Sequence, residues 1–154
     1  CVLRKQGFYD YLKEIGYDTS NIQEFQLASF ARADGQTAAA DILEKMPQID
    51  AFYSMDDETS IGTILAMKEA NRMECKAITG GGGCQEYFKI IASEEGKAIG
   101  AASALYSPAM IQDAIKVAIK VLNGEEAPAE TIIPTTIVSA ENVEQHLDPS
   151  NNVY

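Results

Sequence analysis

Apolar residues recur along the chain at two alternating spacings, one typical of amphipathic helices and the other typical of short buried strands. Helical spacing appears first over Arg4 to Ile15, and again over Gly35 to Met46, where Pro47 ends the pattern. The same spacing predicts further helices after Asp56 or Asp57, over Gln85 to Ser93, from Ser107-Pro108 to Leu122, and in a short piece over Glu141 to His146. Strands are predicted over Glu24 to Ser29, Asp50 to Met55, Lys76 to Thr79, Ile99 to Leu105 and Thr131 to Val138.

This alternation of strands and helices predicts one α/β domain that spans all 154 residues. Right-handed crossovers would give a mostly parallel sheet with helices on both faces, a three-layer α/β/α sandwich. In such sheets, ligands bind beyond the carboxyl ends of the strands. Four predicted connections meet at that edge of the sheet: Phe30 to Asp34, Asp56 to Glu58, Gly80 to Gln85, and Tyr106 to Pro108.

The net negative charge of the chain disfavours some classes of binding partner. Twelve Lys and Arg against 23 Asp and Glu give a net charge of -11, so no basic surface is expected and direct nucleic-acid binding is disfavoured. No apolar run approaches the roughly 18 to 20 residues that a membrane span needs. Three cysteines, Cys1, Cys75 and Cys84, form no C-x-x-C pair, which favours free thiols over a disulfide framework or a zinc site.

Five sequence segments follow one another in an order that covers nearly the whole chain. They are RKQGF (Arg4 to Phe8), FYSMDDETSIG (Phe52 to Gly62), ITGGGG (Ile78 to Gly83), ALYSPAMIQDAIKVAIKVLNGE (Ala104 to Glu125) and IIPTTIVSAENV (Ile132 to Val143). In this order they resemble the periplasmic sugar-binding proteins of ABC transporters, of the ribose and galactose-binding type, whose fold also forms the ligand domains of lac-repressor-type regulators. The resemblance implies the carboxy-terminal ligand-binding lobe of such a protein.

The resemblance also implies which residues contact the sugar. The family uses an aromatic residue after the second strand, an Asn of an N-D-E motif, an Asp of the glycine loop and a polar residue before the proline, and the matching positions are Phe30, Asp56, Gly82 and Tyr106. Asp56 replaces the family's Asn, and Gly82 replaces its loop Asp. Val2 stands where a further sugar-contacting Arg is often found, so Arg32 is the guanidinium expected at this half-site.

Each of these residues also has a simpler interpretation. Asp56 to Glu58 can act as a helix cap with an acidic first turn, and a divalent metal at this trio is disfavoured because the side chains diverge. Phe30 and Tyr106 can be packing residues, and Arg32 a solvated surface charge. In the run Gly80 to Gly83, a dinucleotide or phosphate loop is disfavoured because G-x-G-x-x-G fails at Gln85, so the run predicts a tight turn close to the ligand.

Catalytic machinery is not evident in the sequence. His146 is the only histidine and lies in the polar tail, so no Ser-His-Asp or Cys-His arrangement is predicted, and Cys84 has no histidine partner. Asp56 is the one carboxylate placed at the expected site, whereas glycoside hydrolysis needs two. We therefore expect no enzyme activity, no cofactor and no metal.

The sequence thus predicts capture of a sugar or similar small polar solute between two lobes, of which this chain supplies one. The expected partners are an amino-terminal lobe of the same protein and the membrane permease, in a periplasmic or extracytoplasmic setting, with lipoprotein anchoring through a preceding segment left open. Because only Cys1 to Leu3 precede Arg4, the first strand of the lobe is also expected to be absent. The alternatives are the effector lobe of a lac-repressor-type regulator and, third, a nucleotide-binding enzyme.

Overall fold

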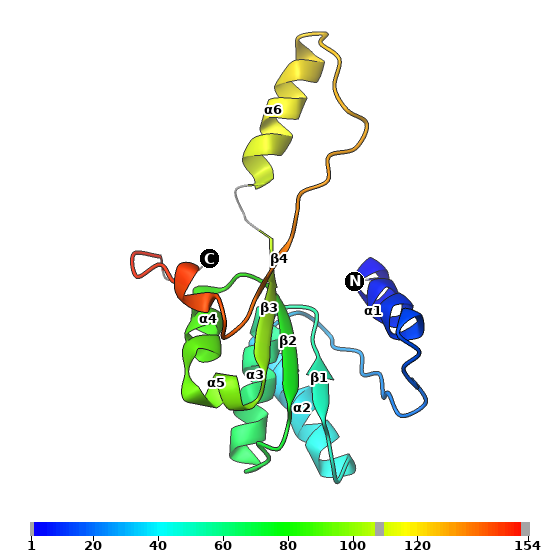
Figure 1. Cartoon of the computed structure of the whole chain (residues 1–154), viewed down its shortest axis with the longest axis vertical. Helices are drawn as coiled ribbons and strands as arrows, with labels where there is room; N and C mark the ends of the chain where they lie inside the picture. Colours follow the sequence, from blue (N-terminus) through cyan, green and yellow to red (C-terminus); the bar gives the residue numbers. More distant parts are fainter. Residues whose placement is uncertain (1, 107–109, 152–154) are drawn as a thin grey trace.

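A computed structural model of the chain describes residues 2–106 and 110–151 (Figure 1). Cys1 and the predicted helix start at Ser107-Pro108 lie outside the described residues. The strands form one four-stranded sheet in the order β1-β2-β3-β4, in which the first three strands are parallel and β4 is antiparallel to β3. The strands are β1 (Ala51–Tyr53), β2 (Ala77–Gly82), β3 (Ala101–Leu105) and β4 (Thr136–Val138).

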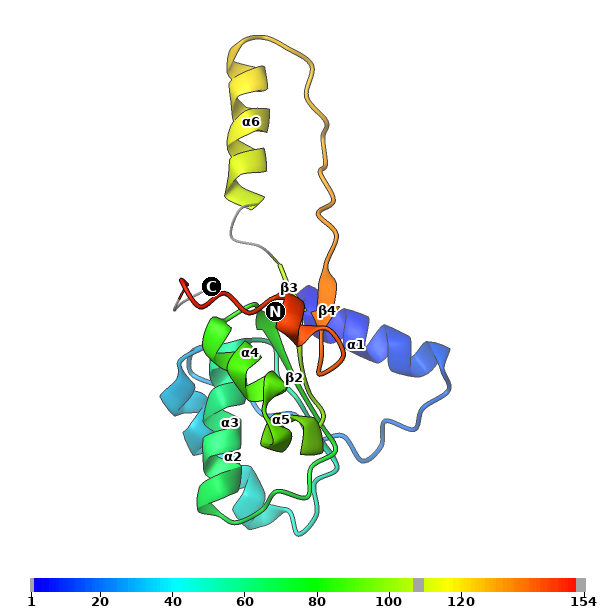
Figure 2. The same cartoon turned by 60° about the vertical axis from the view of Figure 1, so that its left-hand side comes forward.

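Helices lie on both faces of this sheet, as the sequence predicts. One face is covered by α2 (Arg32–Lys45), α3 (Asp57–Glu69), α4 (Gln85–Ala92) and α5 (Glu94–Ala98), and the other face carries α1 (Val2–Glu14) (Figure 2). A 3-10 turn, η1 (Val143–Gln145), follows β4 within the predicted piece Glu141 to His146. The predicted α/β sandwich with a mostly parallel sheet is confirmed.

The core lies between the sheet and the helices α2 to α5. Ile78 of β2 and Val138 of β4 are fully buried on this side, where Ile64 of α3 and Tyr87 and Ile91 of α4 pack against them. Successive strand residues alternate between the two faces, so Thr79 faces away from this core, toward the side of α1. The sheet face beneath α1 therefore carries small and partly exposed residues instead of a second packed core.

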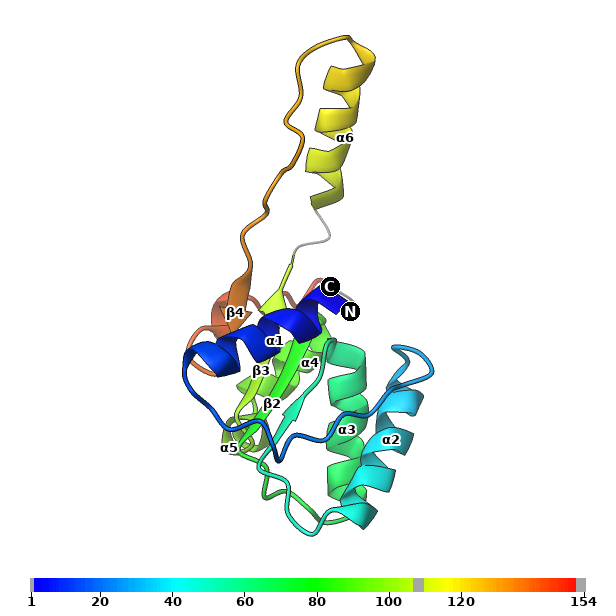
Figure 3. The same cartoon turned by 90° about the vertical axis from the view of Figure 1, so that its right-hand side faces the viewer.

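One predicted strand is wrong. Glu24 to Ser29 forms no strand in the structure, and β1 is left at the edge of the sheet. The Glu24 carboxylate accepts hydrogen bonds from Lys5 and Tyr9 of α1, which ties this segment to the helix on the far face of the sheet. The chain between α1 and α2 passes across β1 in the view of Figure 3, but it forms no strand that pairs with β1.

A long excursion of the chain leaves the sheet between β3 and β4. It contains α6 (Met110–Leu122), which projects away from the sheet and its helices in all three views (Figure 1). None of the described residues of α6 is buried, and Ile111, Ile115 and Ile119 are each at least half exposed. The apolar stripe that the sequence places on this helix therefore has no packing partner within the described residues. No helix of the described chain is both long and apolar enough to span a bilayer.

Candidate ligand-binding site

Three of the predicted site residues follow neighbouring parallel strands at one edge of the sheet. Asp56 comes shortly after β1, Gly82 ends β2, and Tyr106 directly follows β3. In the register of the sheet, Gly82 pairs with Leu105, the residue before Tyr106. These three residues are thus brought together at the carboxyl ends of the strands, the edge where doubly wound sheets bind ligands.

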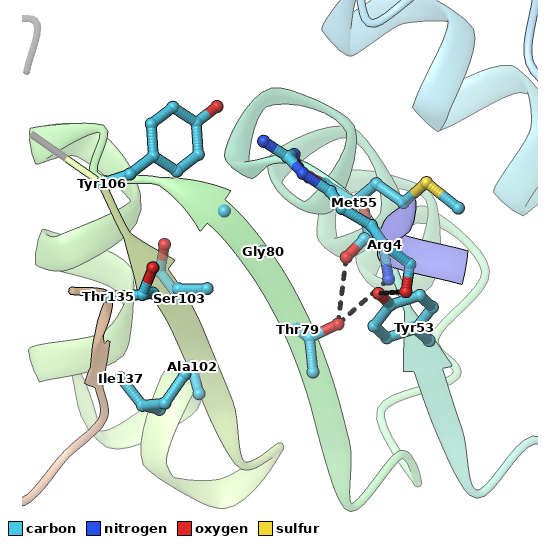
Figure 4. Close-up of a pocket in the computed structure, with 13 residues that line it drawn as sticks. Arg4, Tyr53, Met55, Thr79, Gly80, Ala102, Ser103, Tyr106, Thr135 and Ile137 are labelled. Atoms are coloured by element: carbon cyan, nitrogen blue, oxygen red, sulfur yellow. Dashed lines mark hydrogen bonds between the residues drawn. The ribbon is translucent and has the colours of Figure 1, made fainter. Parts of the chain in front are cut away.

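A pocket of about 340 Å³ opens over the same ends of β1, β2 and β3, on the face of the sheet that carries α1 (Figure 4). It combines two tyrosine rings, small residues of the strands and one guanidinium. Among the five predicted residues, only Tyr106 lines it. The lining residues are Arg4, Tyr53, Ser54, Met55, Thr79, Gly80, Gly81, Ala102, Ser103, Ala104, Tyr106, Thr135 and Ile137.

Arg4 reaches this pocket from α1. Its Nη1 donates to the carbonyl oxygen of Met55, and its guanidinium carbon lies 5.0 Å from the centre of the Tyr106 ring, a cation–π distance. Figure 4 shows the side chain extending from the Met55 side of the pocket toward Tyr106. In the sequence, Arg4 opens the motif RKQGF, and no ligand-binding role was predicted for it. The one available signal was its helical spacing from Phe8, four residues later, because Phe8 stacks on Tyr53 and so holds this part of α1 against β1.

Asp56 begins α3 as a side-chain cap. One carboxylate oxygen accepts the Thr59 backbone N–H at 2.9 Å, and the other accepts the Thr59 hydroxyl at 2.9 Å. This is the helix-cap interpretation that the sequence left open. The Thr79 hydroxyl accepts the Ser54 backbone N–H and donates to the Ser54 carbonyl oxygen, both at 3.1 Å. The carboxyl ends of β1 and β2 are therefore joined by these side-chain hydrogen bonds as well as by the backbone hydrogen bonds of the sheet.

The glycine loop is held from below by Asp57, which is only 2% exposed. One carboxylate oxygen accepts the backbone N–H groups of Gly83 and Cys84 at 2.8 and 2.7 Å, and the other accepts the Ser103 hydroxyl at 2.6 Å. Gly82 and Gly83 have φ angles of 132° and 105°, which residues with a side chain rarely adopt. The predicted tight turn is therefore present, and a buried carboxylate fixes it against β3.

Arg32 begins α2, and Phe30 precedes it by two residues. The Arg32 guanidinium forms paired hydrogen bonds with Glu86 at 2.9 and 2.7 Å, and it also binds Glu58. The hydrogen bonds that Arg32 donates to Glu86, and then those to Glu58, raise the pKa of Arg32 above its ordinary value, so it stays charged. Phe30 is 58% exposed. Neither residue lines the pocket, because α2 packs against α3 and not over the sheet edge.

Reactive groups are not gathered at this edge. Burial raises the pKa of the Cys84 thiol, which lies 3.8 Å from a Glu58 oxygen, so the thiolate form is disfavoured at neutral pH. His146 lies beyond β4, where its ring packs near Phe88 of α4. Within residues 2–106 and 110–151, no group of three or more His, Cys, Asp or Glu side chains is arranged to hold a metal ion.

Comparison with known families decides what this arrangement is. Residues 1–126 match the model of the periplasmic binding protein domain, which covers most of the chain. The chain belongs to this family. This match confirms the predicted resemblance to the periplasmic sugar-binding proteins. No significantly similar sequence was found among curated proteins.

Solved structures of transporter components have the same fold. An ABC transporter solute-binding protein from Mycobacterium smegmatis with bound glycerol is 26% identical, with a TM-score of 0.81 over 98% of this chain and 51% of that one. A solute-binding protein from Bacillus halodurans with bound myo-inositol is 25% identical, with a TM-score of 0.73 over 94% of this chain and 48% of that one. A solute-binding protein from Agrobacterium vitis with bound allitol is 22% identical, with a TM-score of 0.78 over 94% of this chain and 51% of that one. At this identity, the likeness shows only that the two proteins share a fold. The chain spans about half the length of these proteins.

Proposed function

We propose that this periplasmic binding protein domain binds a sugar, a polyol or a similar small polar solute for an ABC-type uptake transporter and performs no chemical reaction. The observation that carries the proposal is the pocket at the carboxyl ends of β1 to β3, where aromatic rings, a guanidinium and a glycine loop meet. A sugar needs forked donors for its hydroxyls and a flat apolar surface for its C–H face. The related proteins from Mycobacterium smegmatis and Bacillus halodurans, with glycerol and myo-inositol bound, support this ligand class.

In this proposal, each residue of the half-site has a definite task. Arg4 donates paired hydrogen bonds to the solute, and Tyr106 presents its ring to the C–H face. Gly82 lets the backbone of the loop approach closely, and Asp56, whose two oxygens accept hydrogen bonds from Thr59, fixes the start of α3 at the rim. Phe30 and Arg32 stand outside the pocket, so Phe30 meets only the part of a solute that extends beyond it, and Arg32 ties the start of α2 to the starts of α3 and α4 through Glu58 and Glu86.

The second half of the site comes from an amino-terminal lobe of the same protein. The chain leaves β3 at Leu105 and returns to β4 at Thr136, two residues that pair in the sheet, so the excursion that carries α6 is joined to the sheet at one place. The exposed isoleucines of α6 suit burial against another folded body. We propose that α6 packs on the second lobe. This departs from the sequence interpretation, which kept all 154 residues in one lobe.

The open edge of β1 fits the same two-lobed protein. Within the described residues, β1 pairs only with β2, and residues 2–5 form part of a helix and not a strand. An unpaired strand edge offers backbone donors and acceptors to a further strand. We propose that the strand that the resemblance places before Arg4 pairs here and completes the sheet.

The solute would favour the closed arrangement of the lobes because only that state surrounds it, and a membrane permease of the transporter would bind the closed form on the periplasmic side. A thermal-shift screen against sugars and polyols tests the proposal in the longest natural protein that contains these residues. A ligand at 100 times its dissociation constant should add about 2.7 kcal/mol to the free energy of unfolding. Tyr106→Ala should remove that gain.

The matched control is Tyr17→Ala. Tyr17 is 61% exposed and lies outside the pocket, so its loss should leave the ligand-dependent shift intact. A screen in which no sugar or polyol stabilises the protein would contradict the proposed function. A nucleotide that stabilised it in their place would favour the nucleotide-binding alternative.

A further inference from the structure

The pocket carries a positive charge, whereas the chain as a whole is strongly acidic. Arg4 is the one charged residue among those that line it, and no Asp or Glu does so, although acidic residues outnumber basic ones by 23 to 12 in the whole chain. The other two arginines each pair with carboxylates: Arg32 with Glu58 and Glu86, and Arg72 with Glu74. Arg4 forms no ion pair within the described residues. Its positive charge is therefore uncompensated at the place where a ligand is expected.

The position of Arg4 is fixed by its own backbone and by the sheet below. The Tyr53 hydroxyl donates to the Arg4 carbonyl oxygen at 3.0 Å, and the Tyr53 ring stacks on Phe8 at 4.2 Å between ring centroids. Gly81 leaves room for the Met55 carbonyl oxygen that accepts from Arg4, because a Cβ at position 81 would lie only 3.1 Å from that oxygen. The guanidinium is thus held at the end of β1 while most of its N–H groups remain available to a ligand.

The acids nearest in sequence to this edge already accept hydrogen bonds from neighbouring groups of the chain. Both carboxylate oxygens of Asp56 accept hydrogen bonds from Thr59, and both oxygens of buried Asp57 accept from the glycine loop and from Ser103. At Gly82, where the family resemblance implies an Asp, the chain has no side chain. The lining thus offers no like charge that would repel an anionic ligand beside Arg4.

We infer that the solute carries a carboxylate and belongs to the sugar acids, uronic or aldonic, and not to the neutral sugars. This inference rests on the proposed function, since it names the ligand class of the same pocket. A carboxylate matches the planar fork of a guanidinium through two parallel N–H···O hydrogen bonds, which a single hydroxyl cannot form. The rest of the sugar then lies toward Tyr106 and Tyr53, with its hydroxyls turned to the rim.

Matched pairs of neutral and acidic ligands test this class. Isothermal titration of the longest natural protein that contains these residues would compare galactose with galacturonate, glucose with glucuronate, and sorbitol with gluconate. We expect at least one acid to bind at least tenfold more tightly than its neutral partner, with affinity that falls as salt is raised. Arg4→Gln should remove this preference, and Arg4→Lys should restore only part of it because an ammonium lacks the fork.

Lys68→Gln is the matched control, because it removes the same unit of charge from an exposed ion pair with Glu95, and neither residue lines the pocket. It should leave the preference for the acid unchanged. Thermal unfolding without ligand checks that each variant is folded. Equal or tighter binding of the neutral sugars would overturn the inference and leave the proposed function standing. No binding by either class would reject both.

Discussion

Gly62 of α3 lies directly against the backbone of Arg32 at the start of α2. A Cβ at position 62 would stand 2.1 Å from the Arg32 carbonyl oxygen and 2.7 Å from the Gln36 nitrogen. The approach is reciprocal, since a Cβ at Gly35 would meet the Thr59 carbonyl oxygen at 2.7 Å. This close crossing explains in physical terms the glycine that ends the segment D-D-E-x-x-x-G. It also sets the start of α2, and with it Arg32, beside Glu58.

Gly62→Ala should therefore destabilise the protein, by about 2 kcal/mol or more, because the methyl group meets rigid backbone and forces the helices apart. Urea unfolding monitored by circular dichroism measures the change. Gly7→Ala in α1 is the control, since nothing lies within 4 Å of its added Cβ. That substitution should stabilise α1 by about 0.5–1 kcal/mol. Equal effects at the two positions would show that α2 and α3 do not approach as closely as described.

Asp57 offers a second prediction, because its buried carboxylate is the shared acceptor for Gly83, Cys84 and Ser103. Asp57→Ala should cost roughly 3 kcal/mol of stability, since it leaves two buried N–H groups and a hydroxyl without their acceptor. Asp57→Asn should cost much less, because an amide oxygen can still accept and its NH₂ group can donate to Ser103. A double-mutant cycle with Ser103→Ala should give a coupling energy of about 1 kcal/mol or more.

Hydrogen exchange separates a local role of Asp57 at the glycine loop from a general effect on the stability of the protein. Hydrogen exchange at the Gly83 and Cys84 amides should accelerate in Asp57→Ala well before exchange in the core of α3 does. If Ala and Asn at this position destabilised the protein equally, charge and not hydrogen bonding would hold the glycine loop.

Arg72 closes the carboxyl end of α2. Its Nη1 donates to the carbonyl oxygens of Leu43 and Met46 at 2.9 and 3.1 Å, and its Nη2 donates to that of Pro47 at 3.0 Å. The last carbonyl groups of a helix have no partner inside the helix, so this fork replaces a cap. Arg72→Lys should lower the unfolding free energy by about 1–2 kcal/mol, because one ammonium cannot reach all three oxygens. Thermal unfolding at matched salt measures the loss, and a neutral effect would show that water replaces the fork.

Local patterns predicted most of these elements because their packing partners lie nearby in the sequence. Spacing over Gln85 to Ser93 gave α4 almost to its ends, since Tyr87, Phe88 and Ile91 pack on the sheet beside it. Glu24 to Ser29 has an equally good strand pattern, but the pattern does not show which partner the segment takes, and Glu24 binds Lys5 and Tyr9 of α1 while the segment pairs with no strand. The pattern in α6 likewise predicts an apolar face but not what covers it.

For the candidate site, connectivity predicted the edge of the sheet, but only Tyr106 of the five predicted residues lines the pocket. Position after a parallel strand placed Asp56, Gly82 and Tyr106 at one edge, because that rule depends only on connectivity. Arg4 enters the pocket across the face of the sheet, from a helix whose position depends on the stacking of Phe8 on Tyr53. Arg32 was expected to serve the ligand, but its partners, Glu58 and Glu86, come from two other helices that spacing alone does not bring together.

The buried thiols Cys75 and Cys84 give a prediction for alkaline pH. Burial raises the pKa of both above the ordinary value of 9.0, so each is mainly protonated in the folded chain at pH 8. Because the thiolate is the nucleophile, alkylation by iodoacetamide at pH 8 should be slow at both sites in the native protein and fast after denaturation. Mass spectrometry of peptides assigns the rates to each cysteine. Rapid native labelling at Cys84 would show that its helix terminus, and not its burial, controls the thiol.

Stability should follow the same titration. A group whose pKa is raised on folding binds its proton more tightly in the native state, so its contribution is complete below the unfolded pKa and is lost as pH rises toward the folded one. The unfolding free energy should therefore fall as the pH rises above about 9, the ordinary pKa of the thiols. Burial raises the pKa of Tyr87 as well, so its contribution is lost only above about pH 10. In the Cys75→Ala/Cys84→Ala protein the decline should begin at higher pH, where tyrosine ionisation starts. An unchanged curve in that variant would assign the alkaline loss to the tyrosines alone.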